Sequence, residues 1–157
     1  MPRREVADIQ ELKSLVGQEV GVGDWMEITQ QRINQFAEAT SDHQWIHEDV
    51  ERCKRESPFG TAIAHGYLTL SLIPHLTKSS FTIKQPFRMG INYGSNKVRF
   101  TSPVPAGSHV RNRMTLLEVS DVPGGWQVHW QVTVEIQGKE KPACVAEVIS
   151  RLYEAPK

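Results

Sequence analysis

The strongest constraint on this chain is an alternation of apolar and polar side chains near its C-terminus. Every second residue of this stretch is apolar, in the order Trp126, Val128, Trp130, Val132, Val134 and Ile136. Because successive side chains of a strand point to opposite faces, this period of two predicts a strand with one buried face. Antiparallel sheets commonly have one covered and one solvated face, so we expect this strand to belong to an antiparallel sheet.

The same period begins at Phe81 and predicts three more strands, with apolar residues near 91–100, 110–119 and 144–152. Segments that contain proline or glycine separate the strands, at 102–107, 122–125 and 137–139. Such residues are typical of turns. We therefore expect the strands to follow one another as an antiparallel meander.

Before Phe81 the apolar residues follow a helical spacing. In residues 6–16 the apolar side chains, including Val16, fall on one helical stripe, and Gly17 follows as a candidate C-cap. This predicts a short helix within an N-terminal extension over residues 1–20. Residues 17–28 are expected to be extended. Thr29 is a favourable N-cap for a helix over 30–39.

Two more helices are expected before the strands begin. The charged segment from Glu48 to Arg55 predicts a short one, and the apolar run from Ala64 to Leu76 a longer one with Pro74 near its end. Since this last helix is apolar all round, we expect burial on every side. Helices followed by an antiparallel sheet indicate an α+β fold, and residues 1–157 are expected to form a single domain.

Composition excludes several classes of protein. The 18 basic and 18 acidic side chains cancel, which argues against a nucleic-acid partner. The longest apolar stretch, 62–76, is shorter than the roughly 20 residues of a membrane span, and the N-terminus lacks the apolar core of a signal peptide. Cys53 and Cys144 form no C-x-x-C motif, so we expect reduced thiols and a cytoplasmic location.

Asp42 and His47 are the leading catalytic candidates. A carboxylate and an imidazole can together hold one water molecule and move its protons near neutral pH. The apolar residues around them would shift their pKa values. The alternative is structural, with Asp42 capping the next turn and His47 on the surface. The D-x4-H spacing alone favours this alternative.

Gly66, preceded by His65, is the second candidate. The N–H groups at a helix N-terminus suit a carbonyl oxygen that becomes anionic in a transition state. Equally, a glycine there could be needed because another backbone packs closely. A metal site is disfavoured: His43 and His47 are four residues apart beside Asp42, yet the segment is not H-E-x-x-H and no further ligands are apparent.

Three other polar residues have two interpretations. Lys97 and Arg99 alternate with apolar residues, which is typical of the solvated face of a strand. They could instead form a basic rim for a phosphorylated ligand such as the nucleotide part of coenzyme A. Ser71 is a small polar residue within the apolar helix that could face a substrate pocket.

The segment FAEATSDHQWIHEDVERCKRESPFGTAIAHGYLTLSL resembles the MaoC-like dehydratases, the (R)-specific enoyl-CoA hydratase family, and within it the NodN-like branch. The family's order and spacing are matched by Phe36, Ser41, Asp42, Ile46, His47, His65 and Gly66. The resemblance continues through INYGSNKVRFTSPVPAGSHVR. Gln44 and Trp45 replace the usual Asn and Pro, and Ser41 stands where Gly is common.

This resemblance implies a hotdog fold, an antiparallel sheet wrapped around a long central helix, and a homodimer. It implies reversible addition of water to a trans-2-enoyl thioester of coenzyme A or acyl carrier protein, without a metal or redox cofactor. Asp42 and His47 would be catalytic, while Gly66, His65, Gln44 and Ser71 would bind or position the substrate. The alternatives are a hotdog acyl-CoA thioesterase and a non-catalytic acyl-CoA-binding protein.

Overall fold

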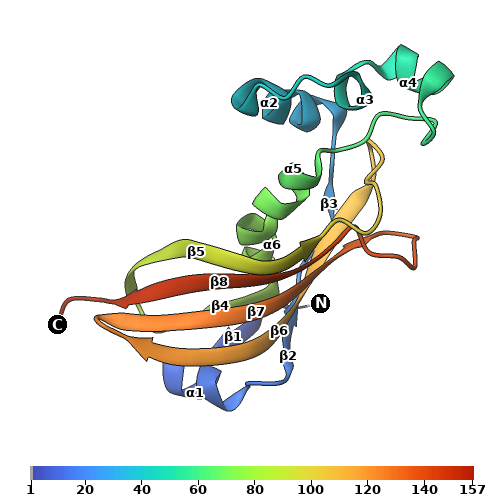
Figure 1. Cartoon of the computed structure of the whole chain (residues 1–157). Coiled ribbons are helices and arrows are strands. Elements are labelled where there is room, and N and C mark those ends of the chain that lie inside the picture. The colour runs from blue at the N-terminus through green and yellow to red at the C-terminus, as the bar shows by residue number, and fades with distance from the viewer. Residues whose placement is uncertain (1) are drawn as a thin grey trace.

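A long antiparallel sheet forms the body of the molecule (Figure 1). The computed structural model describes residues 2–157. The four predicted strands are present as β5 (Phe87–Arg99), β6 (His109–Val122), β7 (Gly125–Ile136) and β8 (Cys144–Glu154). The expected extended lead-in supplies β2 (Glu19–Val22) and β3 (Met26–Glu27), which both pair with β6.

The expected meander is wrong for its first strand. Strands β6, β7 and β8 are consecutive neighbours, but β5 pairs with β8 instead of β6, giving the order β2-β6-β7-β8-β5. Strand β2 occupies the other side of β6, where Val22 faces Arg113. Since β2 and β7 flank β6, no place beside β6 remains for β5, and β5 pairs with β8 at the opposite edge of the sheet.

The central helix differs from its predicted bounds. It consists of α5 (Gly66–Ser71) and α6 (Ile73–Ser80), with a break at Leu72. Pro74 lies in the first turn of α6 and not near a C-terminal end. A proline ring lacks an N–H and clashes with the preceding turn, so it is tolerated at the start of a helix and interrupts one that continues through it.

Burial of the central helix on every side is also contradicted. Its inner face packs on the sheet, with α6 against β6 and α5 against β8. The outer face is open, because Tyr67 is 69% exposed and Pro74 and His75 are exposed too. The buried polar residue Asn112 joins α6 to the sheet through Thr77 (3.2 Å) and Ser80 (2.6 Å).

The N-terminal extension contains a strand as well as a helix. Strand β1 (Arg4–Val6) pairs in parallel with β4 (Phe81–Ile83), and α1 (Ile9–Ser14) follows with Asp8 as its N-cap. Val16 does not lie on the buried stripe, because α1 ends at Ser14. No helix within residues 2–157 is long and apolar enough to cross a membrane.

Three of the helices that precede the central helix stand away from the body of the sheet (Figure 1). They are α2 (Gln30–Thr40), α3 (Trp45–Glu48) and α4 (Val50–Glu56). Thr29 caps α2 as predicted, since its side chain accepts a hydrogen bond from the N–H of Arg32 (3.1 Å). The chain returns to the sheet where Ile63 pairs with Pro105, and this return places α3 beside the start of α5.

Candidate functional site

Asp42 lies in an irregular segment between two helices. Helix α2 ends at Thr40, and Ser41 follows in the left-handed conformation with φ 60°. This turn carries Asp42 away from the helix axis and leaves its side chain exposed. The predicted capping role is weak, since the N–H of Gln44 is 3.5 Å from the Asp42 carboxylate. The carboxylate is therefore available to other partners.

Ser41 occupies a backbone conformation that favours glycine. A side chain at positive φ brings Cβ close to the carbonyl oxygen and costs about 1 kcal/mol. We expect Ser41→Gly to raise the free energy of unfolding by roughly 0.5–1 kcal/mol, measured by urea denaturation. Thr40→Gly, one residue earlier and within the helix, is the control and should lower it. A loss of stability in Ser41→Gly would contradict this interpretation.

His47 is buried, with 7% of its surface exposed, so the alternative of a surface histidine is wrong. Its Nδ1–H donates to the carbonyl oxygen of Ile63 at 2.7 Å. A ring nitrogen that donates leaves the other nitrogen of a neutral imidazole as an acceptor. The backbone of Ile63 thus fixes the tautomer of His47 and leaves Nε2 free to accept a proton.

Burial lowers the pKa of His47 below its ordinary value, and neighbouring His65 acts in the same direction. The carbonyl of Ile63 and the carboxylates of Asp42 and Glu48 oppose this shift without cancelling it. The cause is desolvation, which disfavours the charged form. His47 is therefore held neutral over a wider range of pH than a histidine in water.

This shift predicts a pH dependence of stability. In the unfolded chain His47 takes up a proton near pH 6.5, whereas in the folded protein it does so only at lower pH. The contribution of His47 to the free energy of unfolding is therefore complete above about pH 6.5 and is lost as the pH falls through the folded pKa. We expect His47→Asn to lose less stability than the wild type on going from neutral to acidic pH, by chemical denaturation. Equal losses in both proteins would contradict the assignment.

His65 joins the two predicted catalytic residues. It is the N-cap residue of α5 and is only 3% exposed. Its Nε2–H donates to the main-chain oxygen of Asp42 at 3.0 Å, and its ring stacks on that of His47 with centroids 3.8 Å apart. The sequence motif contained His65, but nothing in the spacing predicted these contacts.

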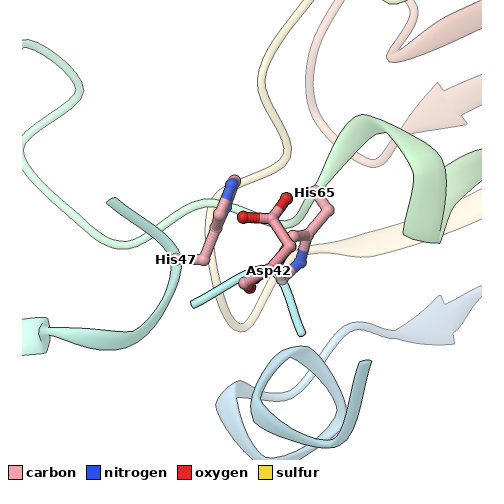
Figure 2. A group of neighbouring side chains, drawn as sticks. All are labelled: Asp42, His47 and His65. Atoms are coloured by element: carbon pink, nitrogen blue, oxygen red, sulfur yellow. The ribbon is translucent and has the colours of Figure 1, made fainter. Parts of the chain in front are cut away.

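The side chains of Asp42, His47 and His65 form one cluster (Figure 2), in which a ligand atom from each lies within 4.8 Å of the others. The chain thus brings the acid and the imidazole together, as predicted. Two imidazoles and a carboxylate could in principle hold a metal ion. However, the rings of His47 and His65 are stacked, with their planes only 21° apart. The lone pairs of the two rings lie in these nearly parallel planes and so do not point at one common ion. The arrangement suits proton transfer better.

Gly66 borders an apolar cavity of about 310 Å³. Its lining includes Phe59, Ala64, Thr69 and Phe100. A Cβ at Gly66 would lie only 2.8 Å from the Phe100 ring, so close packing, by a side chain and not by a backbone, explains the glycine. As the first residue of α5, Gly66 also has a main-chain N–H that needs no helical partner. Close packing at Gly66 and a role of its N–H in binding a substrate oxygen are therefore compatible.

The side chains of the other candidate residues do not belong to the cluster. Gln44 is exposed at the N-cap of α3. Ser71 lines a separate cavity of about 300 Å³ with Tyr93. On β5, Lys97 lies 3.9 Å from the Glu147 carboxylate. Arg99, which donates to the oxygen of Val98 (2.8 Å), directly precedes the cavity residue Phe100.

Two neighbours of the motif face away from the cluster. His43, the partner considered for a metal site, instead contacts Glu48 (3.0 Å) and is exposed. The ring of Trp45 is covered by the guanidinium group of Arg52, 4.1 Å from its centroid. Arg52 belongs to the exposed helix α4. The tryptophan that replaces the usual proline is thus held against α4 and not over the two histidines.

Known proteins share this arrangement of elements. Residues 11–138 match the family described as MaoC like domain. Over 149 residues the chain is 49% identical to 3-hydroxyacyl-thioester dehydratase Z of Mycobacterium tuberculosis, which covers 94% of this chain and 97% of that protein. The chain belongs to the MaoC-like dehydratase family. The predicted resemblance is confirmed, and the protein is a hydro-lyase.

This MaoC-like dehydratase is also 45% identical over 150 residues to nodulation protein N of Rhizobium meliloti, covering 95% of this chain and 93% of that protein. The (R)-hydratase PhaJ1 from Pseudomonas aeruginosa, solved in the unliganded form, superposes with a TM-score of 0.70 at 25% identity. That match covers 89% of the MaoC-like dehydratase and 83% of the solved chain. The hotdog fold is thereby confirmed.

Proposed function

We propose that this hydro-lyase adds water reversibly to a trans-2-enoyl-CoA and forms an (R)-3-hydroxyacyl-CoA. The observation that carries the proposal is the cluster itself, in which a carboxylate oxygen of Asp42 lies within 4.8 Å of a ring nitrogen of His47. The apolar cavity at Gly66 lies next to it, because Ile63 both lines the cavity and binds His47. A thioester in that cavity would present its conjugated carbons to a water held by the pair.

The reaction is a balanced addition of one water molecule. Its oxygen bonds to C3 of the enoyl group as its O–H bond breaks, and a proton returns to C2 on the same face. Asp42 and His47 act as one unit in these transfers, because interacting titratable groups share their protons. Hydration causes no net oxidation or reduction, so the proposed reaction requires no redox cofactor. With Asp42 and His47 moving the protons, we propose that it uses no metal either.

Charge develops on the thioester oxygen as water adds. The main-chain N–H of Gly66 would stabilise this oxygen, and one such donor is typically worth about 3 kcal/mol. Gln44, two residues after Asp42, would position the water or the substrate. Ser71 would line the path of the acyl chain only if that chain reaches the second cavity, where this residue lies.

Binding of the carrier and dimerisation both involve β5. Arg99, beside the cavity residue Phe100, and Lys97 would contact the phosphates of coenzyme A. The same strand is an unpaired edge with exposed apolar residues, including Met89 (47%) and Tyr93 (53%). Such edges are usually covered, and we propose that a second copy covers this one in a homodimer. Light scattering on the purified protein measures the mass directly.

The proposed reaction is tested with crotonyl-CoA. Loss of the enone absorbance, with release of no free thiol and formation of the (R)-3-hydroxy product, is the expected result. Thiol release without hydration would instead indicate a hotdog thioesterase. Binding without any turnover across enoyl chain lengths would indicate an acyl-CoA-binding protein. The position of Trp45 favours turnover, because its ring contacts Arg52 and it is not among the residues that line the cavity at Gly66.

A further inference from the structure

The hydrogen bonding of His65 leaves one of its two ring nitrogens without a partner in the described part of the chain. Its Nε2–H must be the donor to Asp42, because a carbonyl oxygen can only accept. The other ring nitrogen, Nδ1, is buried and has no hydrogen-bond partner among residues 2–157. A buried polar atom without a partner is destabilising. A glutamine could make the single bond and a phenylalanine could fill the space, so neither bonding nor packing alone explains the histidine.

The bond to Asp42 matters because little else holds that residue. Asp42 follows the left-handed turn at Ser41 and belongs to no helix or strand. Among residues 2–157, the main-chain oxygen of Asp42 accepts one hydrogen bond, and its donor is His65. The position of the carboxylate therefore depends on a donor that comes from another element, 23 residues farther along the chain.

The same ring also fixes His47. The two imidazoles are stacked, and the ring of Phe36 in α2 also packs against His65, with ring centroids 4.9 Å apart. His47 is thus held in plane by Ile63 and from its face by His65. One side chain at the start of α5 therefore contacts both members of the proposed catalytic pair.

We infer that His65 is a positioning residue, which aligns Asp42 through its backbone and His47 through its ring, and does not itself touch the substrate. This inference rests on the proposed function of the pair. A positioning residue affects the rate without contributing to binding, so kcat should depend on His65 while KM does not. Misplacement of a catalytic group by about 1 Å is sufficient to slow a reaction about a hundredfold.

Two substitutions separate the donor from the ring. His65→Gln places an amide N–H near the position of Nε2 and keeps the bond to Asp42, whereas His65→Phe keeps a ring against His47 and loses the donor. We expect His65→Gln to retain kcat for crotonyl-CoA within about tenfold, because the donor is kept. We expect His65→Phe to lose about a hundredfold with little change in KM. His65→Leu, which also lacks the donor, is measured in parallel in case the phenylalanine variant does not fold.

A second measurement does not depend on turnover. Amide hydrogen exchange of residues 41–44, followed by NMR in the folded protein, reports how firmly the Asp42 segment is held. Exchange should be about tenfold faster in His65→Phe than in the wild type, since a partly buried hydrogen bond is lost, and unchanged in His65→Gln. If wild type fails to hydrate any enoyl thioester, the proposed function is wrong, while this exchange experiment still decides whether His65 holds Asp42.

Two outcomes would overturn the inference. The first is wild-type kcat and wild-type exchange in a folded variant that lacks the donor. The second is an equal loss of kcat in the glutamine and phenylalanine variants, at equal thermal stability and with wild-type exchange of residues 41–44 in both, since the bond to Asp42 would then neither hold that segment nor set the rate. The pH profile of kcat in His65→Gln adds a further check. Without the neighbouring imidazole, while Asp42, Glu48 and the carbonyl of Ile63 still face His47, its acid limb should move to higher pH.

Discussion

Asp42→Asn is expected to lower kcat for hydration of crotonyl-CoA by about a thousandfold, because a positioned acid or base contributes roughly 10²–10⁴ to a rate. Asparagine has nearly the shape of aspartate, and the bond from His65 goes to the main-chain oxygen, so the fold and the position of the segment should persist. The loss would then report the missing charge and proton acceptor. Initial rates are followed by the enone absorbance.

Glu38→Gln is the matched control for this substitution. Glu38 is an exposed acid at the end of α2, its only ion-pair partner among the described residues is His43 at 3.6 Å, and it lies outside the cluster. It should keep the wild-type rate. A folded Asp42→Asn variant that retains wild-type turnover would remove Asp42 from the mechanism.

Replacement of His47 by asparagine is expected to have an effect of similar size, about a thousandfold on kcat. The amide of asparagine lies near the position of Nδ1, so the hydrogen bond to Ile63 can be kept while the free acceptor Nε2 is removed. His47→Ala would lose both, and leave the carbonyl of Ile63 without this partner. The comparison of the two variants separates proton transfer from folding.

His43→Asn is the control for the histidine. His43 lies four residues earlier in the same motif, but it is exposed and contacts Glu48 instead of the cluster. Steady-state rates with crotonyl-CoA should be unchanged in this variant. Equal losses at positions 43 and 47 would indicate that disturbance of the segment, and not removal of Nε2, causes the effect.

The sequence predicted the strands better than their order. Alternation in 126–136 depends only on which side chains are buried, and β7 extends from Gly125 to Ile136 as expected. The place of β5 beside β8 depends on which sheet edge is free after β2 has paired with β6. That is a property of the assembled sheet. The break at Leu72 could have been expected, since Pro74 cannot continue a helix that begins before it.

For the site, spacing indicated the residues and not their contacts. Asp42 and His47 are five positions apart, and only their common surroundings show that both contribute to one cluster. Burial of His47 arises because Ile63 and His65 return to it from 16 and 18 positions farther along the chain. A local sequence pattern cannot predict contacts between residues so far apart in the chain. The motif, with His-Gly at a fixed spacing, indicated the residues involved without their geometry.

The central claim is that Asp42 and His47 act as one unit on a single water molecule, and a double-variant cycle tests it most directly. The measured quantity is kcat for crotonyl-CoA in wild type, Asp42→Asn, His47→Asn and the double variant. Residues that act as a unit show strongly non-additive losses. We therefore expect the double variant to be about as slow as the slower single variant. Losses that multiply, giving about a millionfold decrease from two losses of about a thousandfold, would show that the two residues act independently and would contradict the claim.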